Sequence, residues 1–171
     1  MNYMEVKYNN ISNGPGVRTS LFVSGCSHHC EGCFNFDAWN RNSGQPYTQE
    51  VQDKILKSFD NSHIDGLTLL GGEPMMDYNV ETLIDLCKAI RESYPNKTIW
   101  VYSGWTYEEL IVKPKQLELL QLCDVLVDGK WVTSLYSPKL NFRGSSNQRI
   151  IDLKETFRTG TVVLDKHHNE I

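Results

Sequence analysis

Short apolar segments alternate with amphipathic segments along most of this chain, and this alternation restricts the fold more than any other feature. The segments that predict strands are residues 17–23, 66–70, 98–102, 124–128 and 149–153. Those that predict helices are residues 48–61, 79–94, 106–111 and 114–122. Such alternation is typical of parallel strands joined by crossover helices. Because a closed eight-stranded barrel needs about 250 residues, we expect an α/β fold with a mostly parallel sheet, in the form of a partial, open β/α barrel.

The prediction of these helices is based on apolar residues at helical spacing and on residues typical of helix ends. The segment 79–94 carries such a stripe, made of Val80, Leu83, Ile84, Cys87 and Ile90. Thr48 is a candidate N-cap for the first helix, and Pro114 is placed to open the last one. These signals predict amphipathic helices that pack one face against the sheet.

Chain length and charge limit the possible classes of protein. With 171 residues the chain is the size of one ordinary domain, and we expect a domain over residues 1–155 followed by a tail over 156–171. A net charge of -4 gives no reason to expect nucleic-acid binding. The sequence has neither an apolar run long enough for a membrane span nor a secretory signal at its start. We therefore expect a cytoplasmic protein with reduced thiols.

Four glycine-containing loops follow predicted strands. They are SGCSHHCEGC at 24–33, GGEP at 71–74, SGWT at 103–106 and DGK at 128–130. In parallel α/β sheets the loops after the carboxyl ends of the strands form the functional edge. The four loops are therefore expected to converge on one site.

The first of these loops holds three cysteines, Cys26, Cys30 and Cys33, in a C-x3-C-x2-C spacing. In the cytoplasm a tight cysteine cluster indicates metal binding or redox chemistry, and not a disulfide framework. Thiolates are soft ligands that suit zinc, copper(I) or iron–sulfur clusters. Three ligands leave open what completes the site.

Two kinds of centre remain possible on residue chemistry alone. A structural zinc site needs a fourth protein ligand, and the candidates are His28, His29, Cys87 and Cys123. Cys87 lies on an apolar helical stripe and Cys123 borders a strand, so both are expected in the core. The other possibility is a 4Fe–4S cluster whose fourth iron stays open to a small molecule.

The cysteine motif after a first strand, followed by GGEP one βα unit later, resembles the radical S-adenosylmethionine superfamily. The resemblance implies that the open iron is chelated by the amino and carboxylate groups of S-adenosylmethionine. It also implies that Gly71 and Gly72 bind the amino group through backbone oxygens, where glycine lets the backbone approach a ligand closely. The other reading of GGEP is a plain strand-to-helix turn.

Further cofactor contacts follow from the same resemblance. The superfamily often has an aromatic residue before the third cysteine, whereas this chain has Gly32. The backbone of Gly32, Cys33 and Phe34 is therefore the expected contact with the adenine. Ser103 is a candidate for a hydrogen bond to the cofactor carboxylate, and an ordinary turn serine is the alternative.

A closer resemblance extends from residue 13 to about 153. The blocks that carry it are NGPGVRTSLFVSGCSHHCEGCFN, NSGQPYT, GGEP, YSGWTYEEL, DVLVDGKW and FRGSSNQRIIDL. They resemble the activating enzymes of the anaerobic ribonucleoside-triphosphate reductase. The resemblance implies an oxidoreductase in which a reduced cluster cleaves S-adenosylmethionine to a 5′-deoxyadenosyl radical, which takes hydrogen from a glycine Cα of the reductase. It implies a flavodoxin or ferredoxin as reductant, and no catalytic side chain beyond the cluster ligands.

Two alternatives stay open at this point. One is a small radical S-adenosylmethionine enzyme that acts on a metabolite or peptide. The other is a zinc-binding interaction module without catalytic activity. The small size favours a protein substrate, because an open barrel leaves a side through which a loop of a partner can enter.

Several polar residues outside the motifs have alternative possible roles. Asp128 and Lys130 form a D-x-K, which is either beside the cofactor or in a solvated turn. Arg18 is expected either to contact the partner or the cofactor carboxylate, or to make a surface salt bridge. His167 and His168, in the tail, are expected to be solvated.

Overall fold

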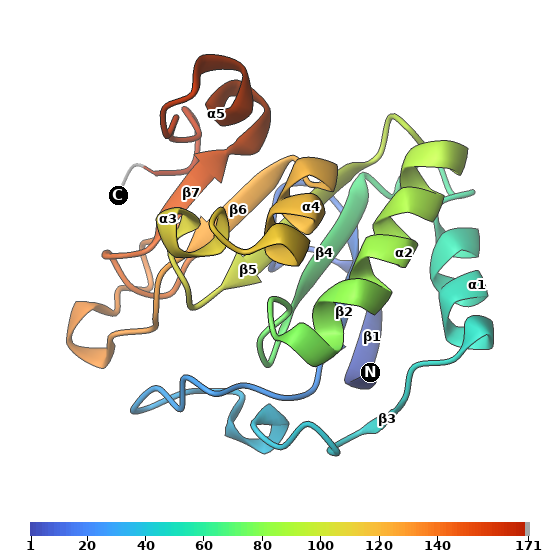
Figure 1. Cartoon of the computed structure of the whole chain (residues 1–171), viewed down its shortest axis with the longest axis horizontal. Coiled ribbons are helices and arrows are strands. Elements are labelled where there is room, and N and C mark those ends of the chain that lie inside the picture. Colours follow the sequence, from blue (N-terminus) through green and yellow to red (C-terminus); the bar gives the residue numbers. More distant parts are fainter. Residues whose placement is uncertain (170–171) are drawn as a thin grey trace.

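Within residues 1–169, which the computed structural model describes, seven strands form one mixed sheet in the order β3-β1-β2-β4-β5-β6-β7 (Figure 1). The strands are β1 (Asn2–Asn10), β2 (Arg18–Val23), β3 (Gln45–Pro46), β4 (Gly66–Gly71), β5 (Thr98–Ser103), β6 (Val125–Asp128) and β7 (Arg149–Asp152). The α-helices are α1 (Gln49–Ser58), α2 (Asp77–Ser93), α3 (Tyr107–Leu110), α4 (Pro114–Leu122) and α5 (Leu153–Thr159). Short 3-10 helices cover Phe36–Ala38 and Thr133–Leu135.

The sheet has a parallel centre and antiparallel edges. Strands β2, β4, β5 and β6 run parallel, whereas β1, β3 and β7 pair antiparallel with their neighbours. The sheet does not close, since β3 and β7 lie at its two edges. The expected open α/β fold is therefore confirmed. The edges differ from a parallel sheet because no α-helix separates β1 from β2 or β6 from β7, and antiparallel pairing needs no crossover helix.

Helices α1, α2 and α4 cover one face of the sheet (Figure 1). Alternate strand residues point to this face, and they form the main core with the apolar stripes of the helices. All five residues of the predicted α2 stripe are buried. Thr48 caps α1 through its hydroxyl, and Pro114 is the first residue of α4, as predicted. None of the helices within residues 1–169 is long and apolar enough to cross a membrane.

The opposite face of the sheet carries a smaller apolar cluster together with one buried cation. Trp100, Val125, Val127 and Ile150 form the cluster. Arg18, at the start of β2, is 1% exposed and donates to Thr68 Oγ1, Thr98 Oγ1 and backbone oxygens of β4 and β5. Both expectations for Arg18 are thus wrong, because its side chain lies inside the protein at the amino-terminal end of the strands.

The end of the described chain folds back onto β7. After α5, Asp165 N donates to Ile150 O at 2.8 Å, and the side chain of Asn169 bonds both backbone groups of Ile150. The ring of His168 packs 5.2 Å from that of Phe142, so the expected solvation is wrong for His168, while His167 is exposed. Helix α5 spans the proposed boundary at 155/156, and the division into domain and tail remains a prediction.

Candidate functional site

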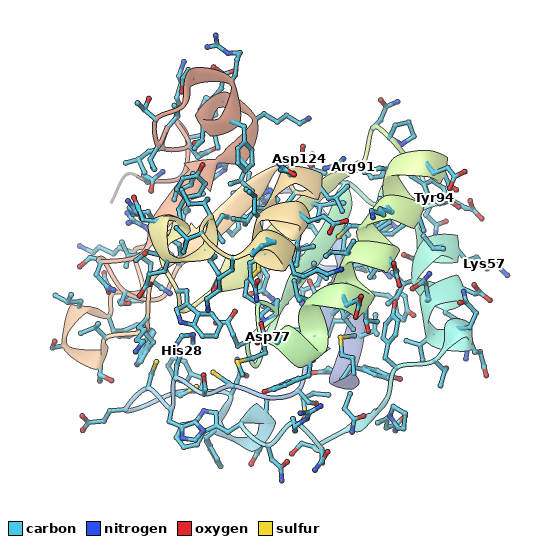
Figure 2. All side chains as sticks on the ribbon, in the orientation of Figure 1. His28, Lys57, Asp77, Arg91, Tyr94 and Asp124 are labelled. Atoms are coloured by element: carbon cyan, nitrogen blue, oxygen red, sulfur yellow. The ribbon has the colours of Figure 1, made fainter. Side chains whose placement is uncertain are left out.

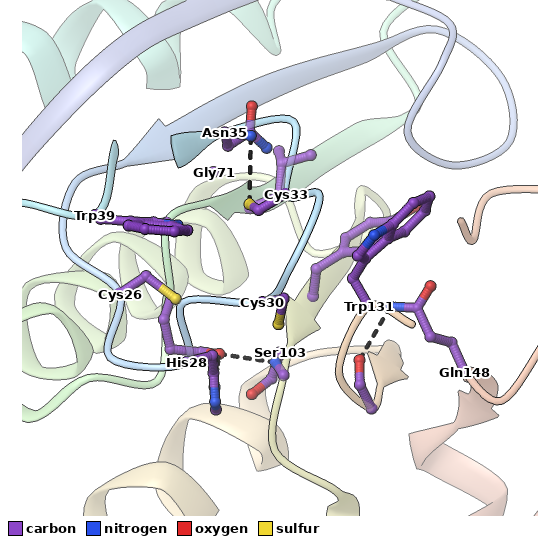
Figure 3. A pocket seen from close by; sticks show the side chains of 16 residues that line it. Cys26, His28, Cys30, Cys33, Asn35, Trp39, Gly71, Ser103, Trp131 and Gln148 are labelled. Atoms are coloured by element: carbon purple, nitrogen blue, oxygen red, sulfur yellow. Dashed lines mark hydrogen bonds and ion pairs between the residues drawn. The ribbon is translucent and has the colours of Figure 1, made fainter. Parts of the chain in front are cut away.

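A pocket lies at the carboxyl ends of the parallel strands (Figure 3). All four glycine-containing loops contribute to it, as predicted. The lining residues are Cys26, His28, Cys30, Cys33, Asn35, Trp39, Leu70, Gly71, Gly72, Glu73, Tyr102, Ser103, Gly104, Gly129, Trp131 and Gln148. Because the three cysteines share this pocket with the turns after β4, β5 and β6, a group bound by the thiols also meets those turns.

The cysteine loop is held by its own backbone and by the segment that follows it. Gly25 N donates to Ala38 O at 2.6 Å and Cys26 N donates to Trp39 O at 3.1 Å. Gly25 has φ +92, and a Cβ there would lie 2.3 Å from the hydroxyl of Tyr78. The loop therefore needs glycine at position 25 to turn tightly before the first cysteine.

All three cysteines are free thiols of intermediate exposure. Burial raises the pKa of Cys26 to about 11, although backbone N–H groups of His28 and His29 act in the opposite direction. Burial also raises the pKa of Cys30. The thiols of Cys26 and Cys30 consequently stay protonated near neutral pH until a metal stabilises the thiolate, so metal binding by these two residues releases protons.

The four candidates for a fourth ligand have other packing or hydrogen-bond partners. Cys87 and Cys123 are buried in the main core, as predicted. His28 Nε2 lies 2.8 Å from Glu73 Oε2, and the ring of His29 stacks on Trp39 at 4.3 Å. The residues described do not bring three or more His, Cys, Asp or Glu side chains close enough to hold one metal ion.

This donor set fits a cluster better than a single zinc ion. A structural zinc shell needs four ligands within about 2.3 Å of one ion, whereas each cysteine of a cubane holds a different iron. Trp39 adds a second observation, because it lines the pocket and its indole Nε1 is buried without a partner among residues 1–169. A bound group with acceptor atoms satisfies such a donor.

The glycine turn after β4 packs directly on the cysteine loop. Gly71 has φ +112, and a Cβ there would lie 2.6 Å from Val23 N. Gly72 N donates to Val23 O at 2.8 Å, and Glu73 N donates to Gly25 O at 2.7 Å. Close packing between the two loops therefore requires glycine at these positions, in addition to the ligand binding that their motif suggests.

Glu73 is the main site residue that the sequence prediction missed. It is 1% exposed, and its carboxylate bonds His28 and accepts from Met75 N and Gly104 N. The GGEP motif, which contains Glu73, was the sequence signal that could have revealed this residue. Trp39, Tyr102, Trp131 and Gln148 also line the pocket and were not predicted as site residues.

Some of the predicted cofactor contacts line the pocket and others do not. Gly71, Gly72, Cys33 and Ser103 line it, and Ser103 Oγ accepts from Trp105 N at 3.1 Å. Gly32 and Phe34 are outside the lining. Gly32 packs on Thr133, since a Cβ at Gly32 would lie 2.6 Å from Thr133 Oγ1. Phe34 is 75% exposed, with its ring 5.0 Å from that of Trp131.

Asp128 is buried at the end of β6, and this corrects the solvated-turn interpretation for Asp128, while a place beside the cofactor stays a prediction. Its buried carboxylate accepts from Arg149 Nε at 3.0 Å and from Tyr107 N at 2.8 Å. These bonds to Asp128, with those to Glu108, raise the pKa of Arg149 further. Lys130 is exposed. Asp128 thus joins β6, β7 and α3 and is not in a solvated turn.

Comparison with known proteins now identifies the class. A family model described as a 4Fe-4S single cluster domain matches residues 12–151, so the fold and the cysteine pocket belong to an iron–sulfur protein of this class. The chain is 43% identical over 156 residues to the anaerobic ribonucleoside-triphosphate reductase-activating protein of Escherichia coli strain K12, which covers 90% of this chain and 100% of that protein. It belongs to the family of anaerobic ribonucleoside-triphosphate reductase-activating proteins.

Two further relatives carry the same description. The protein of Vibrio cholerae is 43% identical over 152 residues, covering 88% of this chain and 97% of the relative. The protein of Enterobacteria phage T4 is 41% identical over 150 residues, covering 88% of this chain and 93% of the relative. The likeness therefore extends over nearly the whole of each relative.

Proposed function

We propose that this protein activates an anaerobic ribonucleoside-triphosphate reductase by reductive cleavage of S-adenosylmethionine. The observation that carries the proposal is the pocket lined by three thiols, those of Cys26, Cys30 and Cys33, while the other cysteines of the described chain, Cys87 and Cys123, are buried in the core. The description that the relatives share names the reductase as the protein acted upon. The fold is then the open barrel of the radical S-adenosylmethionine type.

In this proposal the three cysteines hold a 4Fe–4S cluster and leave one iron for the cofactor. When bound, the reduced cluster would pass one electron to S-adenosylmethionine, whose sulfonium C–S bond would break to give methionine and a 5′-deoxyadenosyl radical, and this radical would take a hydrogen atom from a glycine Cα of the reductase and become 5′-deoxyadenosine. The chain itself binds and orients these groups.

The pocket residues have distinct parts in that task. The backbone of Gly71 and Gly72 is the proposed contact of the cofactor's amino group, and Ser103 is the proposed hydrogen-bond partner of its carboxylate. The backbone of Gly32, Cys33 and Phe34 is the proposed adenine contact. Trp39 and Trp131 form aromatic walls, which keep water from a reactive radical.

The open sheet is consistent with a protein substrate. A backbone Cα reaches the pocket only if a segment of the partner enters it, and the sheet leaves two unjoined edges, β3 and β7. We propose a cytoplasmic protein that takes electrons from a flavodoxin or ferredoxin and requires neither nucleic acid nor a membrane.

The test uses protein reconstituted without oxygen with iron and sulfide. Reduction with dithionite should give the electron paramagnetic resonance signal of a reduced 4Fe–4S cluster, and adding S-adenosylmethionine should change that signal. Mixing with a purified anaerobic reductase should then produce a glycyl radical signal. A colourless protein with stoichiometric zinc would overturn the proposal, and a responsive cluster without radical on the reductase would favour a metabolite or peptide substrate.

A further inference from the structure

His28 and Glu73 form a buried pair at the edge of the pocket. The side chains are 5% and 1% exposed, and His28 Nε2 lies 2.8 Å from Glu73 Oε2. His28 comes from the cysteine loop, between the first two cysteines, while Glu73 comes from the GGEP turn 45 residues later. The proposed chemistry uses neither side chain as a ligand, so their burial needs another explanation.

The Glu73 carboxylate connects three loops. Its Oε1 accepts from Met75 N at 3.0 Å within its own turn. Its Oε2 accepts from Gly104 N at 2.7 Å, in the turn after β5, and bonds His28 in the cysteine loop. A buried carboxylate is costly without such partners, and here its partners come from three of the four loops that line the pocket.

The imidazole of His28 is enclosed on its other sides. A Cβ on Gly104 would lie 2.5 Å from His28 Nε2, so only glycine leaves room for the ring at this distance. The ring of Trp105 meets the imidazole edge-on at 4.4 Å between centroids. His28 therefore has one available position, and that position is defined by the turn after β5 as well as by Glu73.

We propose that His28 is a positioning residue that fixes the cysteine loop, and with it the cluster, relative to the two turns that receive S-adenosylmethionine. The inference rests on the proposed function. One cofactor molecule must reach an iron held by Cys26, Cys30 and Cys33 and also the backbone of Gly71 and Gly72. The cysteine loop and the glycine turn are thus two half-sites for one cofactor. The hydrogen bonds between these loops set the distance between the half-sites. A shift of about 1 Å in such a site is enough to cost about 100-fold in rate.

The test replaces His28 in two ways beside a matched control. His28→Phe keeps a ring of similar size but removes the bond to Glu73. His28→Gln keeps a side-chain amide that can donate to Glu73. His29→Phe is the control, because His29 is the adjacent residue and its ring stacks on Trp39, whereas the hydrogen bonds of the Glu73 carboxylate come from His28, Met75 N and Gly104 N.

The readouts are chosen to separate positioning from folding. Iron and sulfide content and the melting temperature report assembly and stability. The dissociation constant of S-adenosylmethionine, measured by titrating the electron paramagnetic resonance change of the reduced cluster, reports the spacing of the half-sites. The cofactor cleaved per glycyl radical formed reports how well cleavage is coupled to hydrogen transfer.

We expect His28→Phe to assemble a cluster, to bind S-adenosylmethionine about tenfold more weakly, as loss of a charged hydrogen bond allows, and to cleave more cofactor per radical. His28→Gln should recover most of the affinity, and His29→Phe should match the wild type. A His28→Phe protein with wild-type affinity and an unchanged spectral response would overturn the inference.

A second variant covers the case in which His28→Phe does not assemble. Glu73→Gln keeps the side-chain shape but removes the charge and one acceptor oxygen, so it should weaken cofactor binding in the same way. A Glu73→Gln protein with wild-type affinity would then overturn the inference. A wild-type protein that forms no cluster, or whose cluster ignores S-adenosylmethionine, would instead overturn the proposed function.

Discussion

Gly72 lies against the backbone of Gly25, so that a Cβ added to Gly72 would be 2.5 Å from Gly25 O. One residue belongs to the turn after β4, and the other precedes the first cysteine of the loop after β2. The two turns are thus in backbone contact beside the proposed cluster. Glycine at these two positions therefore lets the two loops pack closely against each other, in addition to letting a ligand approach the backbone.

The first prediction follows from this contact. Gly72→Ala should destabilise the protein by about 1–3 kcal/mol, because the new methyl group meets backbone that cannot rotate away. Urea unfolding of the metal-free protein measures the change. The control is Gly160→Ala, at φ +75 with no other atom near the added Cβ, which should cost only about 1–2 kcal/mol of backbone strain. A Gly72→Ala protein as stable as the wild type, with its cluster intact, would contradict this account.

The second prediction separates the ligand cysteines from the core cysteines. Cys26→Ala, Cys30→Ala and Cys33→Ala should each lose the intact cluster and the activity but remain folded, because these thiols contribute little to the core. Cys123→Ala should keep the cluster and lose about 1 kcal/mol of stability from a small cavity. Iron analysis and circular dichroism check both outcomes. Unfolding of Cys33→Ala would instead point to a structural metal, and full activity in that variant would refute the site assignment.

The third prediction concerns the buried guanidinium of Arg18. Arg18→Met should lower the free energy of unfolding by about 2–4 kcal/mol, since buried oxygens of β4 and β5 lose their donors. Thermal and urea unfolding measure this loss. Binding of S-adenosylmethionine should not change, because Arg18 lies at the end of the strands opposite the pocket. Lys7→Met, at an exposed position, is the control, and a weaker cofactor affinity in Arg18→Met alone would show that Arg18 does reach the site.

The fourth prediction concerns acid stability. Arg91 and Asp124 are paired at one end of the sheet, away from His28 at the other (Figure 2). Burial by itself raises the pKa of Asp124, but hydrogen bonds from Arg91, Lys154 and Ile99 N outweigh it and hold the pKa below its usual value. A depressed carboxyl pKa contributes stability above the unfolded pKa of about 3.9 and loses it as pH falls toward the folded pKa.

Asp124→Asn should therefore be less stable than the wild type by about 1–3 kcal/mol at pH 7, and the difference should shrink below about pH 4. Urea unfolding at both pH values measures it on metal-free protein. Asp85→Asn, at an exposed position, should stay within about 0.5 kcal/mol of the wild type at neutral pH. A difference between Asp124→Asn and wild type that is constant with pH would mean that the carboxylate charge is not what stabilises this pair.

The central strands and helices α1 to α4 were predictable because their signals are local, whereas helix α5 (Leu153–Thr159) was not predicted. The buried strands β4, β5 and β6 are short apolar runs, and α2 repeats its apolar residues at helical spacing. Strand β1 escaped prediction, since its exposed and half-buried residues give no apolar alternation of that kind. An edge strand is defined by the neighbour it pairs with, and that neighbour is not visible in a local pattern.

The sequence by itself determined the order of elements, the spacing of Cys26, Cys30 and Cys33, and the presence of glycine turns after the parallel strands. Only the tertiary structure decided which side chains those turns bring together. His28 meets Glu73, and Arg18 finds neutral oxygens instead of an acidic partner. The physical reason is that periodicity and spacing act over a few residues, whereas contacts between loops depend on the register of β2, β4 and β5, which the packing of the whole core sets.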